Sequence, residues 1–410
     1  MNNISIVPFF LYFIFLSCLQ KNTKEKVNTS SASSAKAVNV MAANFKPAII
    51  ADPKKVNTWR GVNLTLQINQ PNSKNLTQAD FDYAATAGAN VIRLVVNADP
   101  KKKNSSVFFD NNGNILPANS SSGIADLKQV SEMADKAGVK IIVDLHIMPG
   151  NTANEIWTNP VYWDRLRDLW VQIATVFKNN NTFLAFDLMN EPGLVQSIQS
   201  PEKGTVQSEM AKGNWAFPKK WQNTPRDYKA QITKLVKAIR NADNDRTLIV
   251  EGYGLFGQPI NFKWLQPVEG VDNIVYSFHM YKPPSITMIG TKGFEGRDSK
   301  PKPFVYPRDA AAIDNAFAPV IEFQKKYNVP IFVGEFGITD EAIFGKDGNK
   351  IPYNGACWLS TVIKKMNDYN WGWTYWSFWI DGRKPTSTSD PRYVILSSAM
   401  KGESIKDYCR

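Results

Sequence analysis

Two glutamates, Glu191 and Glu335, stand at the ends of apolar segments typical of buried strands, in FDLMNEP and FVGEFG. Paired carboxylates suit acid–base and nucleophilic catalysis when one is protonated and the other charged. Further candidates lie within or at the ends of other strand-like segments: Arg93, His146, Asn190, His279, Tyr281 and Trp376. A structural role suits most of these residues singly, but it does not explain why polar groups fall on the same side of successive strands.

The elements that must position these residues follow a regular order. From about Lys55 the sequence alternates short β-type runs with longer helical patterns, which is typical of stacked βα units around a parallel sheet. The strand candidates are Trp59–Leu64, Asn90–Val96, Lys140–Leu145, Phe183–Leu188, Thr247–Val250, Ile274–Phe278, Ile331–Gly334 and Gly372–Ser377. Eight units predict an α/β fold, a closed (β/α)8 TIM barrel. An open doubly wound sheet is the alternative, but no G-x-G-x-x-G follows the first strand.

Helical patterns and long connections complete this prediction. Amphipathic spacing predicts helices around 166–177, 228–239 and 313–321. Two longer segments, Gly193–Trp221 and Tyr281–Pro307, follow strands and predict insertions on the C-terminal rim, where barrels keep their chemistry. Six aromatic residues lie in these insertions or after the third strand, and each could either stack against a sugar ring or pack in the protein interior: Trp157, Trp163, Trp215, Trp221, Phe294 and Tyr306. Phe183, Phe186 and Trp170 are expected in the core.

The chain resembles glycoside hydrolase family 5, the cellulase-type family of retaining barrel enzymes. The resemblance covers Lys55 to Asp381 and rests on an ordered series: R-G-V-N (60–63), Arg93, D-L-H (144–146), N-E-P (190–192), H-M-Y (279–281), G-E-F-G (334–337) and W-S (376–377). It implies that Glu191 is the acid/base and Glu335 the nucleophile. It also implies that the site is completed by Arg93, His146, Asn190, His279, Tyr281 and Trp376.

The chemistry of glycoside cleavage accounts for these residue types. Retention requires one carboxylic acid to protonate the leaving oxygen and a second carboxylate, about 5–5.5 Å away, to attack the anomeric carbon. Arg93 and the Tyr281 hydroxyl would favour the charged form of Glu335. Glu191 has no adjacent cation in the sequence, so desolvation would keep it protonated.

The remaining polar and aromatic residues suit contacts with the sugar. Asn190 can donate to the 2-hydroxyl, a contact that strengthens in the transition state. Trp376 offers a flat face for a pyranose ring, and His146 and His279 would bind hydroxyls or orient Glu191. No cofactor or metal is needed.

Three functions from different classes are compared on this basis. The leading hypothesis is a retaining hydrolase acting on a β-linked polysaccharide or oligosaccharide, endo-acting on β-1,4-glucan, with β-mannan and other β-glycans as alternatives within the family. A non-catalytic surface glycan-binding barrel would be expected to lack one of the two glutamates. A metal-dependent hydrolase is disfavoured, because the chain has two His and no H-x-H pair.

Composition excludes several other classes. The chain has 410 residues, is 43% hydrophobic and carries a formal charge of +11 that is scattered rather than gathered in a stripe, which argues against nucleic-acid binding. Three Cys without a C-x-x-C pair exclude a disulfide scaffold and a thiolate zinc site. The spacing leaves open whether Cys357 and Cys409 form a bridge.

The N-terminal segment predicts export. Ile4–Leu16 is an apolar run too short to span a bilayer but suited to a signal peptide. Phe15-Leu16-Ser17-Cys18 loosely resembles a lipoprotein signal, so Cys18 is a candidate lipid anchor, and an ordinary secretion signal is the alternative. Residues 1–18 are thus expected to be a signal peptide, 19–44 a flexible tether and 45–410 one catalytic domain. We expect a monomer that is secreted or held at the cell surface or outer membrane.

Overall fold

Eight parallel strands pair in chain order and close into a barrel in the computed structural model. The structure describes residues 51–68, 75–101, 105–150, 155–193, 221–254, 256–290, 301–345, 353–379 and 383–409. The strands are β1 (Arg60–Thr65), β2 (Val91–Asn97), β3 (Lys140–Ile147), β4 (Phe183–Asp187), β5 (Thr247–Glu251), β6 (Ile274–Met280), β7 (Ile331–Phe336) and β8 (Gly372–Tyr375). β1 pairs with both β2 and β8, which completes the closure.

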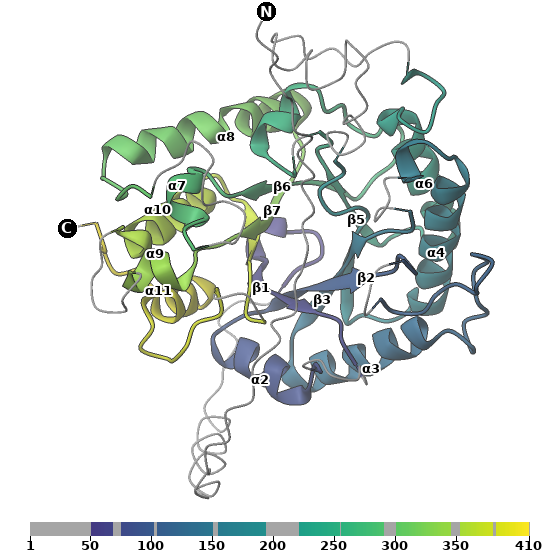
Figure 1. Cartoon of the computed structure of the whole chain (residues 1–410), viewed down its shortest axis with the longest axis horizontal. Helices are drawn as coiled ribbons and strands as arrows, with labels where there is room; N and C mark the ends of the chain where they lie inside the picture. Colours follow the sequence, from purple (N-terminus) through teal and green to yellow (C-terminus); the bar gives the residue numbers. More distant parts are fainter. Residues whose placement is uncertain are drawn as a thin grey trace, which may run out of the picture. The chain divides into compact units, whose positions relative to one another are not determined.

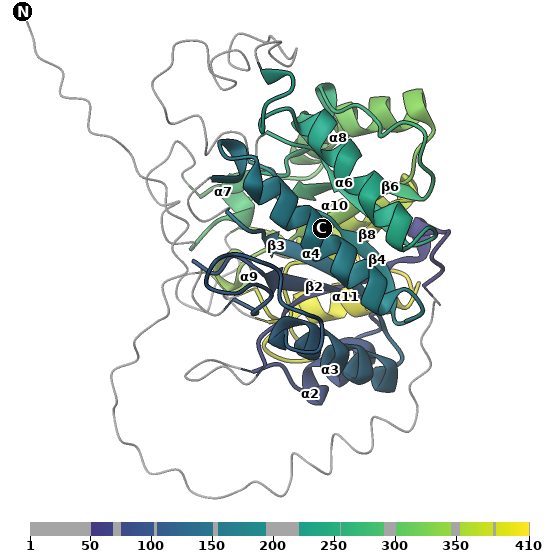
Figure 2. The same ribbon diagram turned by 90° about the vertical axis from the view of Figure 1, so that its right-hand side faces the viewer.

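Helices surround the strands in the described residues (Figures 1 and 2). The longer ones are α2 (Gln78–Thr86), α3 (Ser122–Ala137), α4 (Val161–Phe177), α6 (Tyr228–Ala242), α8 (Arg308–Tyr327), α10 (Gly355–Asp368) and α11 (Pro391–Met400). Shorter ones are α7 (Pro284–Thr287), α9 (Asp340–Phe344) and the 3₁₀ turns η2 (Val56–Thr58), η3 (Glu155–Trp157) and η6 (Pro259–Lys263). The prediction of a (β/α)8 TIM barrel is confirmed.

Local sequence signals explain where several helices begin and end. Ser121 caps α3 by accepting a hydrogen bond from the Ile124 N–H at 3.2 Å, and Asp227 caps α6 in the same way through Ala230. α3 ends at Gly138, whose φ of +71° is the left-handed conformation that glycine adopts without a Cβ clash. The buried face of α6 consists of the predicted positions: Tyr228, Ile232, Leu235, Val236 and Ile239.

Inward-facing side chains form two layers inside the barrel, because side chains alternate between the two faces of a strand. The layer nearer the strand N-termini is apolar: Trp59, Val91, Ile142, Ala185, Ile249, Val275 and Phe332. Two residues further along β2, β3, β4 and β5, the layer nearer the C-terminal rim is charged: Arg93, Asp144, Asp187 and Glu251. Because inward-facing positions recur at every second residue of a strand, these four charged side chains lie one layer closer to the C-terminal rim than the apolar layer does.

Most of the predicted elements match the observed ones. All eight strands begin within one residue of their predicted starts, and β6 and β7 each extend two residues further. Phe183, Phe186 and Trp170 are fully buried, as predicted. In the described part of the β5–β6 connection, 252–254 and 256–273, the helical element is the short η6. Residues 194–220, which form most of the first predicted insertion, and residues 291–300 within the second lie outside the described residues.

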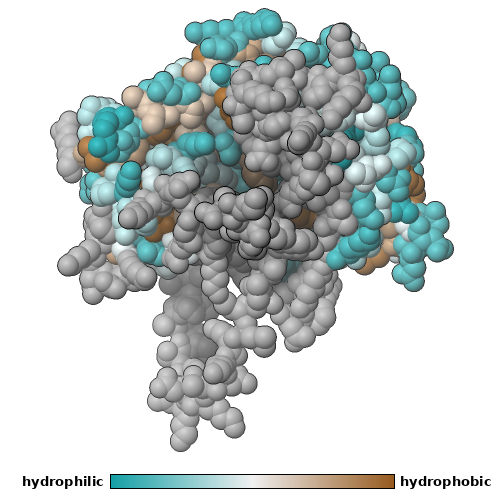
Figure 3. All heavy atoms as spheres, turned by 45° about the horizontal axis from the view of Figure 1, so that its top comes forward, coloured by the Kyte–Doolittle hydropathy of each residue, from teal (hydrophilic) through white to brown (hydrophobic). Residues whose placement is uncertain are grey.

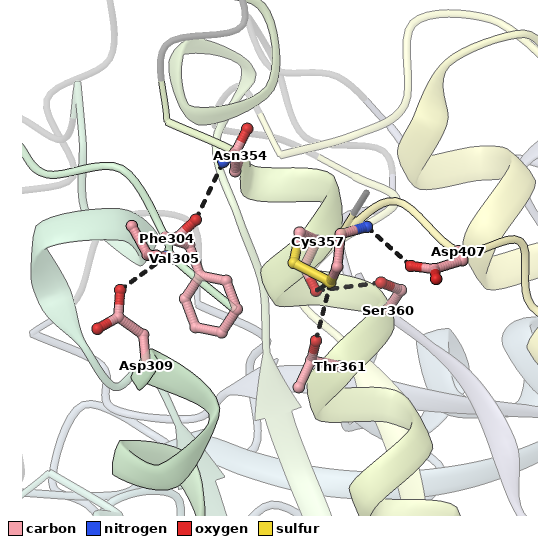
Figure 4. The surroundings of a disulfide bond; sticks show 9 residues. Phe304, Val305, Asp309, Asn354, Cys357, Ser360, Thr361 and Asp407 are labelled. Carbon is pink, nitrogen blue, oxygen red and sulfur yellow. Dashed lines mark hydrogen bonds between the residues drawn. A yellow bond between two sulfur atoms is a disulfide. The ribbon is translucent and has the colours of Figure 1, made fainter. Parts of the chain in front are cut away.

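A disulfide joins α10 to the segment that follows α11 (Figure 4). The Cα atoms of Cys357 and Cys409 are 4.7 Å apart. The Cys409 N–H donates to the Asp407 carboxylate at 2.9 Å, and the Thr361 hydroxyl lies 3.5 Å from the Cys409 sulfur. The bridge that the sequence spacing left open is therefore formed, and it fixes the C-terminal segment against α10.

Removing this disulfide should destabilise the protein. The bridged residues are 52 positions apart, and closing a loop of that size stabilises a fold by about 4 kcal/mol in the chain-entropy model. We expect the C357A/C409A double variant to lose up to that amount in urea unfolding, and reductant to destabilise the parent but not the variant. An unchanged unfolding midpoint in the double variant would contradict this expectation.

Where Figure 3 draws described residues in colour, the surface is mainly hydrophilic, with smaller hydrophobic areas between. The large hydrophobic side chains exposed among the described residues are Val107, Val161, Val305 and Tyr306. None of the helices in the described ranges combines the length and the apolar character needed to cross a bilayer.

Candidate active site

Arg93 on β2 forms the centre of the charged layer. Its side chain is fully buried, and burial alone would lower its pKa, but the surrounding carboxylates raise that pKa well above its usual value. The guanidinium lies 2.9 to 3.3 Å from the carboxylates of Asp144, Asp187, Glu251 and Glu335. A planar cation with five donors is suited to bind several carboxylates at once. Arg93 therefore joins strands β2, β3, β4, β5 and β7 at the rim.

Glu335 on β7 is turned inward by a local irregularity in the strand. Ser277 of β6 pairs with Phe332, whereas His279 pairs with Glu335, so β7 holds one extra residue. This shift reverses the alternation and places Glu335 on the same face as His279. Gly334 lies at the shift, where a Cβ would stand 3.0 Å from the His279 Nε2 atom. The missing side chain allows the close approach.

Two donors hold the Glu335 carboxylate in place. The Arg93 guanidinium donates to Oε1 at 2.9 Å, and the Tyr281 hydroxyl donates to Oε2 at 3.0 Å. Burial and the neighbouring Glu335 charge raise the pKa of Tyr281 well above its usual value, so the hydroxyl keeps its proton. Both oxygens of Glu335 thus accept a hydrogen bond, and the two donors fix the orientation of the carboxylate.

Glu191 lies four residues after β4 in a strained backbone conformation. Its φ is +42°, in the left-handed region that costs non-glycine residues about 1–3 kcal/mol. The Glu191 N–H donates to the Glu251 carboxylate at 2.9 Å, which holds this conformation. Its side chain is 27% exposed, and its Oε1 atom lies 2.8 Å from the His279 Nδ1 atom.

The electrostatics of Glu191 differ from the sequence-based expectation. Burial alone would raise its pKa, but the hydrogen bond and charge of His279 lower it. Burial alone would lower the pKa of His279, but the carboxylates of Glu251 and Glu335 raise it well above its usual value. The expectation of a protonated Glu191 without an adjacent cation is thus corrected for the free protein, because His279, 88 residues away in the sequence, supplies the cation.

The two glutamates approach each other across the rim. Ligand-type atoms of Glu191, His279 and Glu335, one from each residue, all lie within 4.8 Å of one another. Retaining glycosidases hold their carboxyl groups about 5–5.5 Å apart, whereas inverting enzymes need about 6.5–9.5 Å to admit a water molecule. The observed separation fits direct attack by one carboxylate on a carbon held between the pair.

The other predicted site residues gather around this pair. The Asn190 side-chain oxygen accepts from Arg93 at 2.9 Å, which turns its amide nitrogen away from the guanidinium. The His146 Nδ1 atom lies 2.9 Å from the Asp144 carboxylate, and its ring stacks on Trp376 with centroids 5.3 Å apart. Trp376 is only 8% exposed. The structure brings all eight predicted residues to one rim.

Four buried polar residues that were not predicted from the sequence also hold this arrangement: Asn63, Asp144, Asp187 and Glu251. Asn63 accepts from Arg93 at 3.2 Å and donates to the Gly334 carbonyl at 3.1 Å. Asn63 and Asp144 lay inside the quoted motifs R-G-V-N and D-L-H without a role. Glu251 could have been found from the sequence, because it is a carboxylate at the end of an apolar strand, TLIVE, just as the two predicted glutamates are.

The aromatic residues that were predicted as possible sugar platforms differ in how exposed their side chains are. Trp157, Trp163 and Trp221 are at most 5% exposed, and Trp157 and Trp163 pack edge to face, which favours the packing role. Tyr306 is 55% exposed. Trp215 and Phe294 lie outside the described residues.

Comparison with known proteins decides the family. The model of the cellulase family, glycosyl hydrolase family 5, matches residues 49–382. The chain belongs to glycosyl hydrolase family 5. Among its curated relatives, endoglucanase B of Ruminococcus albus is 26% identical over 307 residues, which cover 71% of this chain and 65% of that protein. Endoglucanase C of Acetivibrio thermocellus is 22% identical over 355 residues, which cover 76% of this chain and 88% of that protein.

Solved structures share the barrel of this family 5 chain. The endoglucanase Cel5A from the hyperthermophilic Thermotoga maritima aligns with a TM-score of 0.63 and 21% identity, covering 85% of this chain and all of that one. A structure of the same enzyme in complex with mannotriose gives a TM-score of 0.62. At this identity the likeness concerns the fold, and the chemistry must be argued from the side chains.

Proposed function

We propose that this family 5 protein is a retaining, endo-acting hydrolase of β-linked glucan. The observation that carries the proposal is the approach of the two glutamates, because one carboxylate oxygen of Glu191 lies within 4.8 Å of one of Glu335. This distance supports double displacement, in which one carboxylate attacks the anomeric carbon and the other transfers protons.

In the first step Glu335 is the nucleophile and Glu191 the acid. The bond from the anomeric carbon to the Glu335 carboxylate forms while the glycosidic carbon–oxygen bond breaks, and the leaving oxygen takes a proton. That proton comes from the Glu191–His279 pair, whose Oε1 and Nδ1 atoms are 2.8 Å apart. A bound sugar removes water from the half-buried Glu191, which favours its neutral, protonated form.

In the second step water cleaves the glycosyl ester, and Glu191 acts as the base. Esterification removes the negative charge of Glu335, and losing a nearby like charge favours the ionised form of Glu191. Glu191 then takes a proton from the water that attacks the anomeric carbon, and Glu335 leaves as a carboxylate. We assign Asn190 to the 2-hydroxyl and the Trp376 ring to the pyranose face. His146 is assigned to a neighbouring hydroxyl.

We propose β-1,4-glucan as the substrate, and the relatives named endoglucanase support a glucan. The chain spans 65% and 52% of the length of the two Ruminococcus albus relatives, so their whole activity is not carried over directly. β-Mannan is the second candidate, because Thermotoga maritima Cel5A has been solved with mannotriose as well as with cellobiose.

A panel of soluble polysaccharides with product sizing tests this proposal. We expect carboxymethylcellulose to lose viscosity rapidly and to yield short oligosaccharides, with Glu335→Ala protein as the inactive control. Faster cleavage of mannan than of carboxymethylcellulose would identify β-mannan as the substrate instead. Binding of glycans without any turnover would replace the hydrolase by a glycan-binding barrel.

Chelation should leave the activity unchanged. Glu191, His279 and Glu335 are close enough to hold a metal ion, but each donor is engaged. Both nitrogens of His279 face carboxylates at 2.8 and 3.0 Å, and both oxygens of Glu335 accept from Arg93 and Tyr281. We expect equal hydrolysis rates before and after EDTA treatment and desalting. A loss that a divalent cation restores would contradict this assignment.

We also propose that the protein is exported and works as a monomer. Export is supported by the apolar run Ile4–Leu16 and by the polar segment 19–44 that follows it. Cys18 is proposed as a lipid anchor, with residues 45–410 as the catalytic domain. Residues 1–50 lie outside the described residues. Mass spectrometry of the mature N-terminus would distinguish a diacylated Cys18 from simple secretion.

A further inference from the structure

Glu251 at the end of β5 is a fully buried carboxylate that the catalytic steps above do not use. Its Oε2 atom accepts from the Glu191 N–H at 2.9 Å. Its Oε1 atom lies 3.0 Å from the His279 Nε2 atom and 3.3 Å from the Arg93 guanidinium. One carboxylate thus contacts the backbone of the acid/base, the ring beside the acid/base and the central cation.

We propose that Glu251 is the positioning residue for acid–base catalysis in this chain: by accepting a hydrogen bond from the Glu191 N–H and placing its negative charge beside His279 Nε2, it fixes the acid/base side chain and keeps a proton on the Glu191–His279 pair. The inference rests on the proposed glycosidase function and adds a residue that sets its proton balance. It acts through Glu191 and His279 and does not touch the substrate.

The backbone contact explains how Glu191 keeps its orientation. Positive φ is unfavourable for glutamate, so the conformation needs a partner that exists only in that geometry. The carboxylate of Glu251 is such a partner, because it accepts the Glu191 N–H. Glu251 is itself held from the other side, where the Tyr228 hydroxyl of α6 donates to its backbone carbonyl at 2.9 Å.

The contact to His279 explains how the pair keeps its proton. The His279 Nδ1 atom forms a hydrogen bond with the Glu191 carboxylate at 2.8 Å, and the Glu251 carboxylate lies 3.0 Å from Nε2 as an ion-pair contact outside hydrogen-bonding geometry. Negative charge on both sides of the ring stabilises the imidazolium. Removing the Glu251 charge would favour the neutral ring, which leaves one proton fewer to share with Glu191. The charged and titratable groups around Glu251 and His279 are Arg93, Asp144, Asp187, Glu191, Tyr228 and Glu335.

Asp187 provides a matched control. It is equally buried and lies 2.9 Å from the Arg93 Nε atom, so its replacement disturbs the same guanidinium while leaving the carboxylate against His279 in place. Burial raises the pKa of Asp187 well above its usual value. Asparagine therefore resembles its protonated form in shape and charge.

The experiment compares the parent, Glu251→Gln and Asp187→Asn in kcat/KM across pH. Glutamine keeps an acceptor for the Glu191 N–H but loses the charge beside His279. We expect the basic limb of the Glu251→Gln profile to move to lower pH by about 1–3 units. The Asp187→Asn profile should keep its limb. An unmoved limb in Glu251→Gln, or an equal shift in both variants, would overturn the inference.

Comparing kcat/KM on substrates with different leaving groups distinguishes a loss of proton transfer from a general structural defect. On cello-oligosaccharides, whose leaving group must be protonated, kcat/KM of Glu251→Gln should fall on the order of 10²-fold. On 2,4-dinitrophenyl β-cellobioside, whose leaving group departs without a proton, the loss should stay below roughly tenfold. Equal losses on both substrates would mean that Glu251 only supports the fold.

Nuclear magnetic resonance of the unmodified chain tests the inference without any variant. The chain contains two His residues, so ¹⁵N-histidine labelling gives two imidazoles, which a His146→Gln sample assigns. We expect His279 to remain doubly protonated at pH values above the usual pKa of an imidazole, because the neighbouring carboxylates raise its pKa. A neutral His279 ring near pH 7 would overturn the inference even if the glycosidase activity is real. Absence of turnover with a charged His279 would instead refute the proposed function.

Discussion

Glu335→Ala should lose on the order of 10⁴- to 10⁶-fold in kcat on every substrate, because no group replaces the carboxylate that forms the glycosyl ester. The loss should not depend on the leaving group, since the anomeric carbon has no nucleophile even when departure is easy. Initial rates on 2,4-dinitrophenyl β-cellobioside and on carboxymethylcellulose measure both cases. Added azide, a small nucleophile, should restore part of the rate and yield the α-glycosyl azide.

Glu191→Ala provides the matched comparison at the opposite carboxylate. We expect a loss of about 10²- to 10⁴-fold in kcat/KM on carboxymethylcellulose and a much smaller one on the dinitrophenyl substrate. Azide should here give the β-glycosyl azide, because it replaces water on the intermediate. Identical patterns in the two variants, or activity close to that of the parent in either, would contradict the roles assigned to Glu191 and Glu335.

Arg93→Met should cause the largest loss of stability among single substitutions at the site. The guanidinium is fully buried and lies against four carboxylates, so its removal leaves buried negative charge without a partner. Breaking a buried ion pair from one side costs about 3–5 kcal/mol. Urea unfolding monitored by tryptophan fluorescence should show this loss, and activity should fall with it, because Glu335 loses a donor.

Arg308→Met is the control for the loss of an arginine as such. The Arg308 side chain is 68% exposed and pairs with Asp309 at 2.7 Å on the surface. Water screens such pairs, so we expect no measurable change in the unfolding midpoint. Comparable midpoints for Arg93→Met and Arg308→Met would show that the buried network does not stabilise the barrel. Arg93→Lys should recover little, because an ammonium cannot match the planar fork.

The barrel could be predicted from the sequence because its signals are local. Buried parallel strands are apolar without alternation, and Gly138 marks the end of α3 by its left-handed conformation. The convergence of Glu191 and Glu335 followed from topology alone, since the C-terminal ends of parallel strands meet at one rim. No side-chain detail was needed for that step.

The buried network could not be predicted, because it depends on register between distant strands. Whether Asp144, Asp187 and Glu251 all face Arg93 is decided by the alternation within four strands at once. The inward turn of Glu335 depends on one extra residue in β7, which strand propensity does not reveal. The lowered pKa of Glu191 in the free protein was not predicted for the same reason, because the neighbouring His279 lies on β6.

The stereochemistry of cleavage tests the central claim most directly. One carboxylate oxygen of Glu191 and one of Glu335 lie within 4.8 Å of each other, which is closer to the spacing of retaining enzymes than to the wider spacing of inverting ones. Proton NMR of the first products released from a cello-oligosaccharide with a blocked reducing end distinguishes the two anomers before they equilibrate. We expect the β-anomer to appear first, with the α-anomer growing only by mutarotation. Initial release of the α-anomer would show inversion and would contradict the mechanism proposed for Glu191 and Glu335.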